Sequence, residues 1–126
     1  MNRRDELIGW MHSFDSKERN DFYLEDLTEM NLIIKEFSSV CLLPGYDIVE
    51  DLKPDEMYDY LMGVIDSHRA WSQELGRVMV LMDQCIKNDN KKEAIDFLTE
   101  FVNRCEWVGL RDIAQSQIKN INLDLL

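Results

Sequence analysis

The sequence has few of the residues that interrupt helices and few that cross-link small folds. Of its 126 residues, two are proline, five are glycine and three are cysteine. The cysteines are odd in number and lack the Cys-x-x-Cys spacing of zinc and redox sites. We therefore expect Cys41, Cys85 and Cys105 to be buried thiols in a reducing compartment. A chain of this length needs neither a disulfide nor a metal to bury a core.

Long apolar runs and a secretory leader are also lacking. No uninterrupted run of about 18 apolar residues is present, so we expect no membrane-spanning helix. The N-terminal sequence MNRRDELIGW reaches charged and aromatic residues too early for a signal peptide. These absences predict a cytoplasmic protein that does not bind membranes.

Histidine, the usual general base, is scarce as well. His12 and His68 are the only two, and the carboxylate nearest to His68 in sequence, Asp66, falls on a different helical face. We expect surface or helix-capping roles for both histidines. Nothing local marks a nucleophile, so we predict no catalytic residues, no cofactor and no metal ligands.

Acidic residues, by contrast, are abundant and unevenly distributed. The chain has 25 acidic and 14 basic residues, for a net charge of -11. Residues 1–60 carry 15 acids and 6 bases, whereas residues 61–126 carry 10 acids and 8 bases. Such a chain repels phosphate backbones and anionic membranes, so nucleic acid is disfavoured as a partner. A basic protein would instead be attracted and oriented by the field of the first half.

Apolar residues recur every three or four positions along most of the chain, which predicts an all-α fold. We expect one small domain, residues 1–126, with about five to eight helices arranged as antiparallel hairpins. The expected helices cover residues 4–14, residues 24–41 with Leu24 and Leu27 in the apolar stripe, residues 54–87, a segment from Asn90, and a last helix from about Gly109.

Three local features refine this expectation. Region 54–87 is too long for one ordinary helix, so a break is expected between Asp66 and Ser72. Gly63 and Gly76 are expected to let helices approach closely. Asn90 and Glu93 form an N-x-x-E signal for a helix start, and Pro54 suits a first helical position.

The segment GYDIVEDLKPDEMYDY, residues 45–60, combines six carboxylates with three tyrosines and one lysine. Carboxylates accept charge-assisted hydrogen bonds from lysine and arginine, and tyrosine rings serve as interface anchors. With Met57 and Leu61 directed to the core, the acids face solvent and form a contact surface. The candidate residues for binding a basic partner are Tyr46, Asp47, Glu50, Asp51, Asp55, Glu56, Tyr58, Asp59 and Tyr60.

An enzymatic alternative comes from other carboxylates. Glu25-Asp26-Leu27-Thr28-Glu29 and Glu56-Met57-Tyr58-Asp59 resemble the E-E-x-x-E and E-x-x-D motifs of all-α nucleoside triphosphate pyrophosphatases. The resemblance implies magnesium held between two helices. The sequence departs from the motif at Asp26, and no cluster of lysine and arginine stands nearby to receive phosphates.

The last third of the chain, EAIDFLTEFVNRCEWVGLRDIAQSQIKNINLDL, resembles the helical immunity proteins of bacterial contact-dependent growth inhibition systems. The likeness lies in a W-V-x-L-R-x-I-A turn, whose residues here are Trp107, Val108, Leu110, Arg111, Ile113 and Ala114. Trp107 in such a turn also fills the gap between the last two helices.

The resemblance implies a non-enzymatic monomer that binds a cognate toxin domain in a 1:1 complex. Many such toxins are nucleases with basic clefts, and a ribonuclease is the favoured target. A third hypothesis based on the same negative charge is an acidic inhibitor or adaptor encoded by a phage or plasmid.

Overall fold

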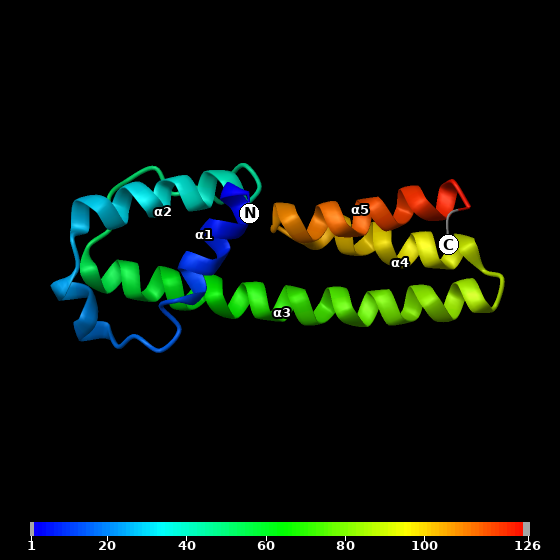
Figure 1. Ribbon diagram of the computed structural model, residues 1–126, viewed down its shortest axis with the longest axis horizontal. Coiled ribbons are helices and arrows are strands. Elements are labelled where there is room, and N and C mark those ends of the chain that lie inside the picture. The colour runs from blue at the N-terminus through cyan, green and yellow to red at the C-terminus, as the bar shows by residue number, and fades with distance from the viewer. Residues whose placement is uncertain (1, 125–126) are drawn as a thin grey trace. The chain divides into compact units, whose positions relative to one another are not determined.

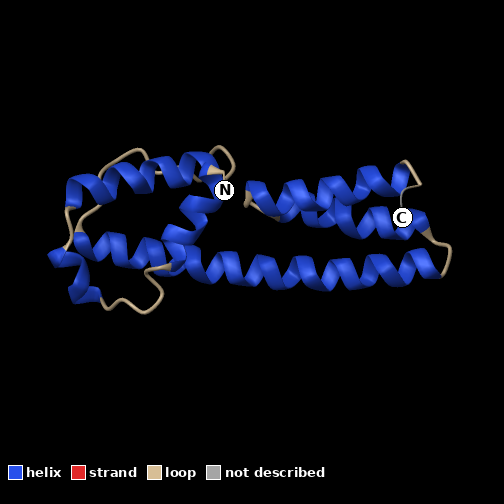
Figure 2. Ribbon diagram, in the orientation of Figure 1, coloured by secondary structure: helices blue, strands red, loops and turns tan. Residues whose placement is uncertain are grey.

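The protein is all-α, as the periodicity predicts. The computed structural model describes residues 2–124, in which five α-helices and one 3-10 helix account for all the regular structure (Figure 1). No strand occurs in this part of the chain (Figure 2). The elements are α1 (Arg3–His12), η1 (Arg19–Leu24), α2 (Leu27–Cys41), α3 (Pro54–Lys87), α4 (Lys91–Arg104) and α5 (Val108–Asn122).

Helix α3 is continuous over 34 residues, so the expected break between Asp66 and Ser72 was wrong. The chain instead divides within this helix into two compact units, of which the first ends at His68 and the second begins at Arg69. Since each half of α3 buries its apolar stripe in a different unit, neither half depends on a turn to reach its core. The length of the segment thus predicted neither the continuous helix nor the division into two units.

The first unit is built on stripes at helical spacing from α1, α2 and the first half of α3. Met57, Leu61 and Ile65 are almost fully buried, as the pattern from Pro54 predicts. A two-bond ion pair between Arg3 and Glu36 fastens α1 to α2, with distances of 2.7 and 2.6 Å. The other buried apolar residues of this unit are Leu7, Met11, Phe14, Phe22, Met30, Ile34, Phe37, Cys41 and Leu42.

Two expectations for this unit need correction at the helix ends. Leu24 does not belong to α2: it ends η1 and its side chain is 86% exposed. Asp26 explains the later start, because its carboxylate accepts hydrogen bonds from the backbone N–H groups of Thr28 and Glu29 and caps α2. Helix α1 ends at His12, and Phe14 is buried from the following turn.

The second unit contains the rest of α3 and a pair formed by α4 and α5, which pack closely (Figure 1). Asn90 Oδ1 accepts from the Glu93 N–H at 3.1 Å, which confirms the capping signal. Trp107 occupies the position just before α5, where its side chain makes no capping hydrogen bond, and it is 2% exposed. Trp107 is thus buried in the connection between α4 and α5, and the last helix begins at Val108, next to the expected start at about Gly109.

The three cysteines are reduced and buried, as expected. Burial raises the pKa of the Cys41 thiol to about 11. The expectation for Gly63 and Gly76 was wrong, because among residues 2–124 no other element has a heavy atom within 4 Å of a Cβ atom built at either position. Both glycines face open space on α3. Within residues 2–124, no helix is both long and apolar enough to cross a bilayer.

Candidate protein-interaction surface

The acidic connection before α3 is held to α2 by two buried polar side chains. Asn31 is 5% exposed; its amide oxygen accepts from the Leu52 N–H at 2.7 Å, and its Nδ2 donates to the Leu52 carbonyl at 3.1 Å. Ser38 is fully buried, and its Oγ accepts from the Ile48 N–H at 2.7 Å. Because both side chains bind backbone atoms, they fix the path of the connection and leave its acidic side chains outside.

Arg19 neutralises part of the acidic surface. The Arg19 guanidinium, from η1, lies 3.4 Å from Asp55 Oδ1 and 3.0 Å from Asp59 Oδ1. It also lies over the Tyr58 ring, 4.6 Å from the centroid. The hydrogen bond to Asp59, followed by that to Asp55, raises the pKa of Arg19. The like charges of Asp55 and Asp59, one turn apart on α3, are therefore bridged instead of repelling freely.

The remaining acids of the segment differ in their partners, which are a lysine, a backbone N–H group or none among the described residues. Lys35 Nζ lies 2.5 Å from Asp51 Oδ1. Glu56 accepts the Lys53 N–H at 2.9 Å at the start of α3, and Asp47 accepts the Gly45 N–H at 3.2 Å. Glu50 is exposed and makes no hydrogen bond or ion pair with the described residues. Among the described residues, no cation neutralises Asp47, Glu50 or Glu56, and Glu50 also lacks a hydrogen bond.

The candidate tyrosines occupy three different environments. Tyr46 is 55% exposed and is the most open of these three rings. Tyr58 is half-buried between Arg19 and the Phe22 ring, whose centroid is 5.9 Å away. Tyr60 points inward: its hydroxyl is buried and has no hydrogen-bond partner among residues 2–124, and burial raises its pKa. The candidate site therefore presents one free ring, one held ring and one ring turned to the core.

Tyr23 extends the surface beyond the predicted segment. It is 58% exposed on η1, and a hydrogen bond to Asp55 raises the pKa of its hydroxyl. The sequence pattern indicated neither Tyr23 nor Arg19 as part of this surface, because their partners lie more than thirty residues away along the chain. It also missed the role of Asn31, although a polar residue within an apolar stripe could have signalled a buried hydrogen-bonding side chain.

The carboxylates of the pyrophosphatase motif have local structural roles in part. Asp26 caps α2 and Glu56 caps α3, while Asp59 binds Arg19. Glu25, Asp26 and Glu29 line a hollow of about 150 Å³ beside Trp10 and Phe14. Among residues 2–124, no three His, Cys, Asp or Glu side chains are grouped so that they could hold a metal ion.

Comparison of the chain with protein families, curated proteins and solved structures found no match. Functional inference therefore depends on the charge and geometry of the surface together with the sequence resemblance. The first unit, up to His68, contains 16 acidic and 6 basic residues, and the second contains 9 acidic and 8 basic residues. The net charges are therefore -10 and -1, so almost all of the net negative charge belongs to the unit that carries the candidate surface.

Proposed function

We propose that the protein is an immunity protein that binds and neutralises a basic toxin domain through the acidic surface of its first unit. The observation that carries this proposal is the net charge of -10 on that unit, combined with an acidic connection anchored by Asn31 and Ser38. A charged surface that is already ordered loses little conformational entropy when it binds. The arrangement suits capture of a cationic protein better than it suits catalysis.

Charge and exposed rings contribute different steps of such binding. The field of the first unit speeds association with a basic partner by electrostatic steering. Exposed aromatic rings, here Tyr46 and Tyr23, fill pockets on the partner and slow dissociation. The favoured partner is a ribonuclease domain, because a cleft that receives a phosphate backbone is itself basic. The complex is 1:1 and cytoplasmic, and the protein contributes no catalytic group.

The experiment is co-expression with the C-terminal domain encoded by the gene directly upstream, which such a system would use for its toxin. The protein is expected to rescue growth and to bind the purified domain. Replacing Asp47→Asn and Glu50→Gln together should weaken binding at low salt by about tenfold, because these acids have no internal cation. Added salt should narrow that difference by screening.

A matched control removes two exposed acids from the second unit, Asp83→Asn with Asp96→Asn. The net charge changes equally in both double variants, so long-range attraction falls by a similar amount. Equal weakening would show that total charge acts without a specific surface, and unchanged binding in the first variant would rule out that surface. Growth arrest without rescue, or magnesium-dependent pyrophosphate release by the purified protein, would contradict the proposed function itself.

A further inference from the structure

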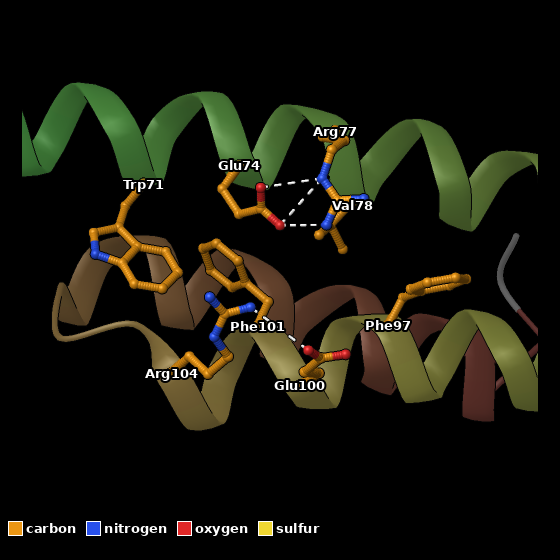
Figure 3. A pocket seen from close by; sticks show the side chains of 8 residues that line it. All are labelled: Trp71, Glu74, Arg77, Val78, Phe97, Glu100, Phe101 and Arg104. Atoms are coloured by element: carbon orange, nitrogen blue, oxygen red, sulfur yellow. Dashed lines mark hydrogen bonds and ion pairs between the residues drawn. The ribbon is translucent and has the colours of Figure 1, made fainter.

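The second unit contains an open groove between α3 and α4 that the acidic surface does not include. Its volume is about 390 Å³, and it is lined by Ala70, Trp71, Glu74, Arg77 and Arg104. Phe97 and Phe101 line an adjoining hollow (Figure 3). Helix α4 packs most closely on α5, and large side chains fill the space towards α3. The groove is within the size range of ligand sites in proteins.

The Trp71 ring forms the floor of this groove, and Phe101 lines the adjoining hollow. Trp71 and Phe101 meet edge to face, with centroids 5.6 Å apart and an interplanar angle of 81°. The guanidinium of Arg104 lies 5.7 Å from the centre of the Trp71 ring. Trp71 is half-buried, so part of the indole remains open to an incoming side chain. The floor favours a planar or apolar group.

Four charged side chains form a rim shared by the groove and the adjoining hollow: Glu74, Arg77 and Arg104 line both, and Glu100 lines the hollow. Arg77 binds Glu74 along α3, and Arg104 lies 3.5 Å from Glu100 along α4 (Figure 3). Among the described side chains, no ion pair joins the two walls. Charges on the two walls nevertheless interact. The pKa of Glu74 on α3 is lowered, first by its hydrogen bond to Arg77 and in smaller part by the charge of Arg104 on α4.

The charged groups of these two ion pairs can separate at low cost and bind the charged groups of a ligand. Arg77, Glu100 and Arg104 have 58%, 66% and 59% of their side chains exposed, and exposed pairs within one helix contribute little to stability. A ligand with only negative groups would meet Glu74 between the walls, and one with only positive groups would meet both arginines. The rim therefore complements a ligand that carries both signs of charge.

We infer that this groove binds a short segment of a partner protein in which an aromatic residue stands between an acidic and a basic residue. The aromatic ring contacts the open part of the Trp71 indole, since Phe101 is only 3% exposed. The acid binds Arg104 or Arg77, and the base binds Glu74 or Glu100. The inference is independent of the proposed function, because every residue of the groove belongs to the second unit. Since the rim is electrically balanced, binding here should depend on salt much less than binding to the acidic surface.

The test uses a tripeptide probe, acetylated and amidated, with phenylalanine between glutamate and lysine. Titration into the whole protein should shift the indole N–H resonance of Trp71 in nitrogen–proton correlation spectra. The resonance is assigned by its loss in Trp71→Phe. The indole signals of Trp10 and Trp107 are internal references and should not move.

Two comparisons separate the proposed recognition from simple apolar adhesion. A second tripeptide, with glutamine on both sides of phenylalanine, should bind at least about fivefold more weakly, because it offers no charge to the rim. Arg104→Gln should weaken the charged peptide by a similar factor, whereas Lys119→Gln, an equal charge change on an exposed residue of α5, should not.

The outcomes are decisive because the substituted side chains are exposed and folding can be checked by circular dichroism. No shift of the Trp71 resonance at saturating probe would overturn the inference. Equal binding of the charged and neutral peptides would also overturn it, since the rim would then contribute nothing. Loss of toxin binding with an unchanged Trp71 titration would concern the acidic surface alone.

Discussion

His12 Nε2 lies 2.9 Å from His68 Nδ1, which joins the end of α1 to the middle of α3. The ring centroids are 5.0 Å apart. One nitrogen must donate and the other accept, so at least one of the two facing nitrogens carries no proton. The histidines, expected to be separate surface or capping residues, therefore form a tertiary contact within the first unit.

This contact predicts an acid-sensitive first unit. Burial, and then the neighbouring His12, lowers the pKa of His68 below the ordinary value of 6.5. Between the folded pKa and 6.5 the unfolded chain binds more protons, so the stabilisation is complete above 6.5 and is lost as the pH falls through the folded pKa. Thermal unfolding followed by circular dichroism should show a melting temperature that decreases between pH ~7.5 and ~5.5. His68→Gln should flatten that slope, and parallel slopes would contradict the role of the pair.

The buried anchor Asn31 predicts a stability loss that an exposed asparagine should not share. Asn31→Ala leaves the N–H and carbonyl of Leu52 without their partner, which should lower the free energy of unfolding by about 1–3 kcal/mol. Denaturant titration measures the change. Asn103→Ala, an exposed change on α4, is the control and should stay within about half a kcal/mol. If the two variants lost equal stability, the anchor would have no special role.

The open surroundings of the α3 glycines predict stabilising substitutions. Gly63→Ala and Gly76→Ala should each raise the free energy of unfolding by about 0.5–1 kcal/mol, because a methyl group meets no neighbour and restricts the unfolded chain. Destabilisation at either site would mean that a neighbouring element does pack there.

The same two variants test whether residues 1–126 unfold as one domain, as the sequence predicts. Gly63 lies in the first unit and Gly76 in the second, although both belong to α3. One cooperative transition, shifted by both changes, would support a single domain. Two transitions, each shifted by only one change, would contradict it.

Burial of the thiols predicts slow chemistry at all three cysteines. The pKa of Cys41 is about 11, and burial also raises the pKa values of Cys85 and Cys105. Little thiolate therefore exists near neutral pH. Ellman's reagent should react with the folded protein only at the rate of unfolding, and with all three thiols in denaturant. Rapid reaction of one thiol in the folded protein would contradict its burial.

The sequence by itself determined the helical class and most of the buried stripes. Met57 and Leu61 follow from spacing, and the helix starts at Pro54 and Asn90 follow from local capping chemistry. These features depend on residues three or four positions apart, whose proximity is set by the helix itself. The local charge density of residues 45–60 was readable for the same reason.

Tertiary structure alone decided which of those charges remain free. Arg19 and Asp59 are 40 positions apart, and His12 and His68 are 56 apart. Their contacts arise only when whole helices pack. The continuity of α3 could not be predicted from the sequence either. The apolar pattern indicates which residues are buried, but it does not show whether the backbone turns between two buried stripes. The groove at Trp71 depends on how far α4 stands from α3, a spacing set by the side chains packed between them.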